Sequence, residues 1–316
     1  MSAITLTAPT SPVSSLKRLL ARRPLLSYFV IAFAGVWIPL LVPVLARNGL
    51  GLLPFTVSDI AFVLLFIPGT LCGPTLGAFV VTAATDGKAG VRRLLRRYVQ
   101  WRVGIHWYLL ILLGYPALDL LNASIWLGAA PVQAFLANWP LLFTSYLPLV
   151  LAMVLFPAFL EEPGWRGFAL PRLEQKFGPL PGSLILGLLH GTWHLPVFFL
   201  TIGPAAMGPF NFLGFARNTF MIMVLTIIWT WVFNNANGSI LIAMLLHAAS
   251  NATGNFSRQI IPALPMPMAG LTADGLIIVC ALLIIVFTRG RLSYKPNLTE
   301  APSKPASSPE GLPAQV

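Results

Sequence analysis

The sequence predicts an all-α fold: a polytopic membrane protein built as an eight-helix transmembrane bundle. Hydrophobic residues make up 57% of the 316 residues and charged residues only 9%, whereas soluble domains carry roughly 25% charged residues. The apolar runs are continuous and reach about 20 residues, which is the length of a transmembrane helix and not the alternating pattern of a membrane strand. These observations exclude the class of soluble globular proteins.

Each apolar run is assigned to one span, in chain order. The first is too long for the core of a signal peptide and lacks a small-residue cleavage site. The second carries Pro68, Gly69, Gly73 and Pro74, which predicts a kink or a tilt. The seventh is short and lies between Asn- and Gly-rich turns. The predicted spans lie near residues 25–46, 57–85, 105–128, 141–162, 181–202, 213–233, 238–252 and 271–288.

The basic residues flank these runs and predict the orientation. With eight spans and both termini cytoplasmic, every Lys and Arg except Arg47, Arg217 and Arg258 falls on the cytoplasmic side. The net charge of +11 is then explained by topology and by anionic lipid, so we expect the lipid bilayer and no nucleic acid as a partner. Cys72 and Cys280 offer no disulfide or zinc-finger spacing. The expected location is the plasma membrane of a prokaryote.

The chain is predicted to hold one membrane domain, at residues 25–290. Residues 1–24 and 291–316 are expected to form disordered cytoplasmic tails, because they are rich in Ser, Pro, Thr and Ala.

Ionisable side chains within the predicted spans are the candidates for function. On insertion scales each costs about 2.5–3.5 kcal/mol at the centre of a bilayer. His106 lies at the start of a span beside aromatic residues and is interpreted as interfacial. The remaining candidates are Asp119, Glu161, Glu162, His190, His194 and His247, with Asn251 as a neutral companion.

The stretch "LLHGTWHLPVFF" places His190 and His194 four residues apart, so a helix would carry both on one face. That spacing is found in the zinc-binding pair of soluble metalloproteases, but Gly191 stands where those enzymes have a glutamate. A metal site and a pair of interhelical hydrogen bonds both remain open.

His247 and Asn251, in "HAASN", share a helix face in the same way. Both side chains can donate hydrogen bonds to an oxygen that gains negative charge, as acyl transfer requires. The alternative is a hydrogen-bonded pair between helices.

The stretch "FPAFLEEPGWRGF" places two carboxylates at the end of the fourth predicted span. Glu162 can pair with Arg166 four residues later, and Pro163 predicts a local distortion of the helix. Glu161 is then left without a partner in this segment, as a general base would be; the alternative is a pair of charges that cap the span. By a rise of about 1.5 Å per residue, His194 lies deep in its span. A bent fourth span or a deep loop at 163–180 must therefore bring it to Glu161.

The three motifs together resemble the type II CAAX prenyl endopeptidase and bacteriocin-processing family, the Abi proteins. "EEPGWRG" is similar to the Glu-Glu-x-x-x-Arg motif of that family, "HGTWHLP" to its second motif, and "HAASN" to His-x-x-x-Asn. The resemblance covers a motif core at about residues 140–255. It implies an eight-helix intramembrane protease domain at residues 25–290 and an endopeptidase that acts on a membrane protein or peptide, with its lipidation open.

The resemblance also implies roles for single residues. Glu161 would activate water with the help of His194, while His247 and Asn251 would stabilise the oxyanion. Glu162 and Arg166 would support the Glu161 segment. His190 stands where the family usually has an aromatic residue, and is an extra candidate ligand or proton relay.

No cofactor is certain from the sequence. Zinc or another divalent metal is chemically feasible, with Glu161, His194 and His247 as candidate ligands. We expect no obligatory metal, because one carboxylate and one histidine suffice to activate water.

Two other functions are compatible with buried ionisable groups. A proton-coupled transporter could use Asp119, Glu161 and the histidines as a relay. A non-catalytic immunity or scaffold protein could bind a partner in the bundle. The resemblance favours the endopeptidase, and Asp119 has no role in it.

Overall fold

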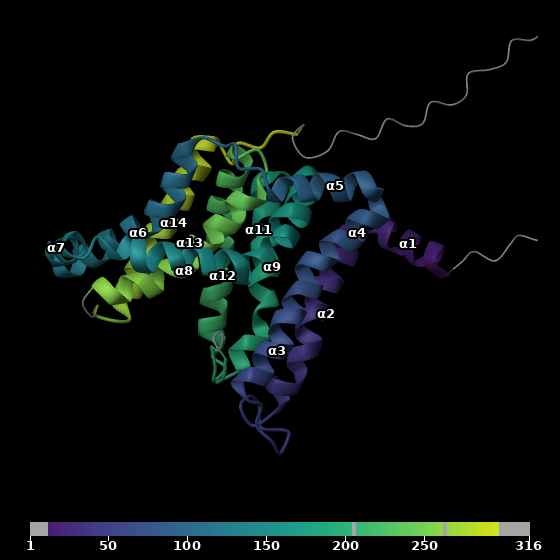
Figure 1. Ribbon diagram of the computed structural model, residues 1–316, viewed down its shortest axis with the longest axis horizontal. Coiled ribbons are helices and arrows are strands. Elements are labelled where there is room, and N and C mark those ends of the chain that lie inside the picture. The colour runs from purple at the N-terminus through teal and green to yellow at the C-terminus, as the bar shows by residue number, and fades with distance from the viewer. Residues whose placement is uncertain (1–11, 204–206, 262–263, 297–316) are drawn as a thin grey trace, which may run out of the picture.

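The predicted fold class is confirmed by the computed structural model, which describes residues 12–203, 207–261 and 264–296. Over these residues the chain is helical and has no strand (Figure 1). Seven helical segments are long and apolar enough to cross a membrane. They are Pro24–Leu45, Asp59–Thr85, Ile105–Leu127, Leu142–Phe177, Pro179–Phe199, Phe212–Asn235 and Met268–Thr288.

The remaining predicted span, 238–252, corresponds to helix α13, Ile240–Ile260. It is not among the seven apolar segments, because its second half is rich in Asn, Ser and other polar residues. Twelve of its residues are buried. Most of its first half is buried inside the bundle, whereas Asn251, Asn255, Arg258 and Gln259 in its second half are exposed.

The N-terminal part of the bundle is a pair of helices in close contact. Helix α2, Pro24–Leu45, packs against a second span made of α3 (Asp59–Thr70), η1 (Leu71–Leu76) and α4 (Gly77–Thr85). The π-type segment η1 contains Pro74, whose missing N–H interrupts the regular helical ladder and gives the predicted irregularity. A Cβ on Gly35 would collide with the backbone of Gly73. Small residues therefore set this close approach.

Three helices connect this pair to the fourth segment. Helix α5, Gly87–Tyr98, carries the basic cluster and is followed by α6, Ile105–Leu127. The short helix α7, Ala130–Ala137, then leads into the fourth segment. Helices α7 and α8 run across the direction of α2 and α12 (Figure 1).

The fourth segment differs from the predicted span at 141–162. It is helical from Leu142 to Phe177 and changes direction at Phe156, whose backbone is extended (φ −155°, ψ 123°). Its parts are η2 (Leu142–Tyr146), α8 (Leu147–Met153), η3 (Val154–Ala158), α9 (Phe159–Glu162), η4 (Pro163–Ala169) and α10 (Leu170–Phe177). Of the two solutions left open by the sequence, the bent span is the one adopted.

The predicted end of this span at Glu162 is therefore wrong. Glu162 keeps helical angles (φ −63°, ψ −32°) although a proline follows it. The expected distortion takes the form of the π-type segment η4, in which the chain continues without the Pro163 N–H. Arg166 is buried in that segment and does not lie in a cytoplasmic loop.

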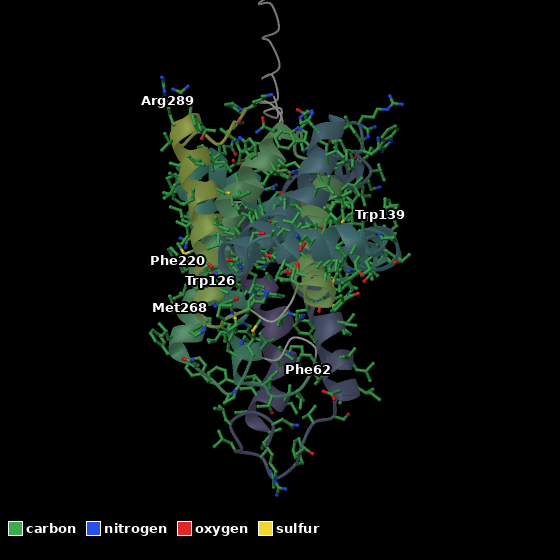
Figure 2. All side chains as sticks on the ribbon, turned by 90° about the vertical axis from the view of Figure 1, so that its left-hand side faces the viewer. Phe62, Trp126, Trp139, Phe220, Met268 and Arg289 are labelled. Atoms are coloured by element: carbon green, nitrogen blue, oxygen red, sulfur yellow. The ribbon has the colours of Figure 1, made fainter. Side chains whose placement is uncertain are left out.

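The C-terminal helices complete the bundle. Helix α11 (Pro179–Trp193) packs along α12 (Phe212–Asn235), and the short η5 (Leu195–Phe199) contacts α2. Helix α14, Met268–Thr288, runs along one edge, with Trp139 at the opposite edge (Figure 2). The start of α2 and the end of α14 both lie in the upper half of the view in Figure 1.

The chain before α2 is more ordered than predicted. Residues Pro12–Arg22 form helix α1, within the expected disordered tail. Leu16, Leu19 and Leu20 are spaced as on one helix face among basic residues, a pattern typical of a helix lying in a membrane interface. The predicted disorder of 1–11 and 297–316 falls outside the described residues.

Candidate active site

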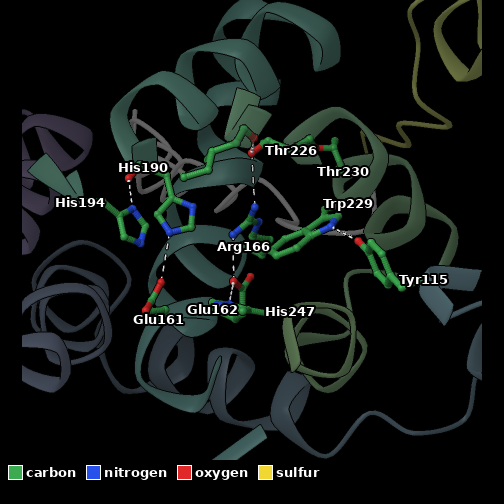
Figure 3. Close-up of polar contacts among 11 residues, drawn as sticks. Tyr115, Glu161, Glu162, Arg166, His190, His194, Thr226, Trp229, Thr230 and His247 are labelled. Carbon is green, nitrogen blue, oxygen red and sulfur yellow. Dashed lines mark hydrogen bonds and ion pairs between the residues drawn. The ribbon is translucent and has the colours of Figure 1, made fainter. Parts of the chain in front are cut away.

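Two consecutive carboxylates form the centre of the candidate site (Figure 3). Glu161 and Glu162 lie on α9 and are 3% and 0% exposed. Successive helical side chains diverge by about 100°, so the two carboxylates enter different hydrogen-bond networks. The site therefore consists of two hydrogen-bond networks, and α9 contributes one carboxylate to each.

The first network holds Glu162 in place. Its Oε1 accepts from Arg166 Nη1 at 2.9 Å and from His247 Nδ1 at 2.8 Å. Arg166 also donates to Thr226 Oγ1 at 3.4 Å and lies 4.5 Å from the centre of the Trp229 ring. The ion pair predicted between Glu162 and Arg166 is therefore present, and both partners are fully buried.

The second network surrounds Glu161. His190 Nε2 lies 3.1 Å from Glu161 Oε2. The Nδ1 of His194 lies 2.9 Å from the backbone oxygen of His190. Because a carbonyl oxygen only accepts, this Nδ1 carries the proton, and the lone pair of His194 is on Nε2.

Aromatic rings fix the two imidazoles. The Trp165 ring lies 4.8 Å from the His190 ring, and Trp193 contacts His194 edge-on at 4.9 Å. Trp193 is itself held, because its Nε1 donates to the Ala32 carbonyl at 2.9 Å. The histidine orientations are therefore determined by packing against α2 and η4.

The positions of His247 and Asn251 differ from those predicted around Glu161. His247 is bonded to Glu162 and not to Glu161. Asn251 lies one turn further along α13 and is exposed. Ligand atoms of Glu161, His190 and His194 lie within 4.8 Å of one another. In this group His190 occupies the place predicted for His247 as a candidate metal ligand.

Several residues that hold the segment around Glu161 and Glu162 in place were not predicted from the sequence. Arg97 of α5 donates from Nη1 to the Gly167 carbonyl at 2.8 Å and from Nε to the Gly238 carbonyl at 2.7 Å. It thereby connects η4 to the turn that precedes α13. Thr75 Oγ1 donates to the Leu160 carbonyl at 2.8 Å, just before the carboxylates. Such contacts join segments about 70 or more residues apart, so no local sequence pattern predicts them.

The backbone beside the carboxylates is packed tightly against η1. A Cβ on Gly164 would lie 2.5 Å from the Pro74 carbonyl oxygen and 2.5 Å from the Tyr28 hydroxyl. Only glycine fits this approach, which fixes how far α9 enters the bundle.

Asp119, which has no role in the predicted site, belongs to another contact. Ser257 Oγ donates to Asp119 Oδ2 at 2.7 Å and joins α6 to α13. Asp119 is therefore satisfied within the bundle.

Fold and site together define a class: a helical membrane protein with buried carboxylates and imidazoles in an arrangement suited to acid–base chemistry. Residues 143–253 match the model of the family described as type II CAAX prenyl endopeptidase Rce1-like. The chain is also similar to CAAX prenyl protease 2 of Methanococcus maripaludis, with 24% identity over 194 residues, which are 60% of this chain and 71% of the relative.

These comparisons confirm the resemblance derived from the motifs. The matched region contains both carboxylates and all three histidines of the site. The chain is a CAAX-protease-like membrane enzyme, a hydrolase of peptide bonds. The transporter and the scaffold receive no support from either comparison.

Proposed function

We propose that this enzyme is an intramembrane endopeptidase that cleaves a membrane-associated protein or peptide with water activated by Glu161. The observation that supports the proposal is the position of Glu161 beside His190 and His194, within the segment that resembles the endopeptidase family. The neighbouring Glu162 is engaged by Arg166. Glu161 is thus the carboxylate available for chemistry.

In the proposed reaction, a water molecule lies between Glu161 and the Nε2 of His194. Glu161 takes a proton from the water as its oxygen attacks the carbonyl carbon of the substrate. The same proton then passes to the amide nitrogen as the C–N bond breaks. The scheme uses only side chains of this protein; a divalent ion, if bound, would supply a Lewis acid at this position.

His247 and Asn251 are proposed to stabilise the oxyanion. The amide of Asn251 can donate in any protonation state. His247 can donate from Nε2 when both ring nitrogens carry protons, and Glu162 is then its counter-ion. Hydrogen bonds of this kind act in the transition state because the negative charge develops there.

The substrate is proposed to reach the site from the bilayer. The relative is named a CAAX prenyl protease, so a prenylated C-terminal peptide is the first candidate. The basic flanks support a plasma membrane location with both termini cytoplasmic.

A reconstituted cleavage assay tests this function. Wild-type protein in liposomes is incubated with a farnesylated, internally quenched CAAX peptide, and products are identified by mass spectrometry. Glu161→Gln preserves shape and removes the base, so cleavage should fall by about 10²–10⁴-fold. Glu174→Gln is the matched control, because Glu174 is also buried on this segment but bonds Asn234.

A second readout does not depend on the chosen peptide. Membranes of cells that express the wild type or Glu161→Gln are compared for new peptide termini. Equal sets of termini, together with equal cleavage of the peptide, would refute the proposal.

A further inference from the structure

The cluster of Glu161, His190 and His194 has the composition of a metal site. One carboxylate and two imidazoles come from two helical elements, and their ligand atoms lie within 4.8 Å of one another. Glu161 and His190 are buried, and His194 is partly buried. A set of two histidines and one carboxylate is one of the ligand sets of catalytic zinc, with one coordination position left for water.

The hydrogen bonds of His194 support this interpretation. Its Nδ1 donates to the His190 carbonyl, which leaves the lone pair of Nε2 free to bind a cation. Metal-binding histidines almost always donate their other ring N–H to a carbonyl or a carboxylate, because this fixes the tautomer and the ring orientation. His194 is therefore oriented as such a ligand.

His190 provides the second nitrogen. Its Nε2 faces Glu161, and its buried Nδ1 has no hydrogen-bond partner among the described residues. Moving the ring proton from Nε2 to Nδ1 would release the Nε2 lone pair toward Glu161. The Trp165 ring, which lies tilted against the His190 ring, would keep it in place during this change.

The local charges also favour a cation. Glu161 and Glu162 as carboxylates carry two negative charges, and Arg166 supplies one positive charge. With His247 neutral, one negative charge is left in excess. An uncompensated charge in an apolar interior is costly, so this charge balance favours the binding of a cation.

From these observations we infer that Glu161, His190 and His194 bind a zinc-type divalent cation, with His190 as a ligand in place of His247. Imidazole nitrogens select zinc and neighbouring transition metals over Mg²⁺ and Ca²⁺, which prefer oxygen ligands. The inference concerns the site of the proposed function, but binding can be measured without a substrate. Its failure would leave a metal-free endopeptidase.

The test is the binding of Zn²⁺ to purified, tag-free protein in detergent. Chelator-treated protein is dialysed against buffered Zn²⁺, and bound metal is measured by mass spectrometry. Wild type should bind one equivalent, and His190→Phe, which keeps an aromatic ring between the tryptophans, should bind more than about 100-fold more weakly. His190→Gln is the second variant, because it retains a polar contact with Glu161. Thermal unfolding of each variant shows whether it is folded.

Two controls decide between this site and its alternatives. His106→Phe makes the same change at an exposed histidine outside the site and should not alter binding. His247→Gln should also retain the metal. X-ray absorption of the Zn²⁺ complex should show imidazole scattering that decreases in His190→Gln.

The inference is overturned if wild type binds no more Zn²⁺ than folded His190→Gln. It is also overturned if His247→Gln or His106→Phe removes the metal while His190→Gln keeps it. Metal binding without cleavage would leave the metal site intact and refute the endopeptidase. Glu161-dependent cleavage without metal binding would do the reverse.

Discussion

His247 donates from Nδ1 to Glu162 across 2.8 Å, on the same carboxylate oxygen that accepts from Arg166. This one oxygen joins α13 to the segment that carries both glutamates. Glu162 is therefore more than the partner of Arg166 that the sequence indicates, because it also orients the histidine proposed for the oxyanion.

Glu162→Gln should destabilise the protein strongly. The substitution leaves the guanidinium of Arg166, which is 1% exposed, without its counter-ion, and breaking a buried pair costs about 3–5 kcal/mol. Thermal unfolding in detergent measures the effect. The double variant Glu162→Gln/Arg166→Met should regain part of the stability but little cleavage, because His247 has still lost its carboxylate. An unfolding temperature of Glu162→Gln equal to that of wild type would contradict this role.

Asn251→Ala should reduce kcat by about 10²–10³-fold and change KM little, as the loss of one oxyanion donor does. The side chain at 251 is exposed, so the unfolding temperature should stay the same. Asn255→Ala, one turn further along α13 and also exposed, is the control and should remain active. Steady-state kinetics in liposomes separates the two parameters. A rise in KM with unchanged kcat would instead make Asn251 a residue of substrate binding.

Arg97→Lys should lower both stability and activity. The planar guanidinium reaches the Gly167 and Gly238 carbonyls at once, and an ammonium group cannot reproduce this fork. We expect a loss on the order of 1–3 kcal/mol, the value of one or two charged hydrogen bonds at a partly buried position. Arg93→Lys changes an exposed arginine of the same helix and serves as the comparison. Identical unfolding curves for the two variants would exclude the connection between α5 and the site.

Gly164→Ala should move the carboxylates. The added methyl group would meet the Pro74 carbonyl at 2.5 Å, and overpacking of this kind costs about 1–3 kcal/mol. Gly254→Ala is the matched control, because its methyl group would meet only the end of the Arg258 side chain at 4.0 Å. Alanine favours helix over glycine, so this control should be neutral or slightly stabilising. The unfolding temperatures and cleavage rates of both variants test this prediction. Equal values for Gly164→Ala and Gly254→Ala would mean that η1 moves to accommodate the methyl group.

The fold class and most spans could be predicted because the length of an apolar run is a local property of the sequence. Composition and the length of the apolar runs sufficed for the all-α membrane class, and the start of each span was found within a few residues. Local patterns failed at Glu162, where Pro163 and Gly164 are typical of a turn. The contacts of this segment with η1 and α5 stabilise a continuous helix there, and those contacts are visible only in three dimensions.

The sequence predicted most of the residues of the candidate site, but it did not predict most of their hydrogen-bond partners. Spacing of four residues correctly paired Glu162 with Arg166. The partners of Glu161 and His247 could not be predicted, because each is set by the rotation of one helix relative to another. His190 illustrates the point: its spacing from His194 marked it as a candidate, and only the bend at Phe156 brings Glu161 to it.

Because the consecutive residues Glu161 and Glu162 have different roles, the enzyme is sensitive to the number of residues in the helix that precedes them. One residue added between Phe156 and Glu161 would turn the following helix by about 100° and bring Glu161 to the place of Glu162. One residue removed would instead bring Glu162 to the histidine pair. The two π-type turns on either side of the carboxylates, η3 and η4, set that rotation. Natural variation in this stretch should therefore proceed by substitution, while a shift in length by one residue would silence the enzyme and leave every functional side chain present.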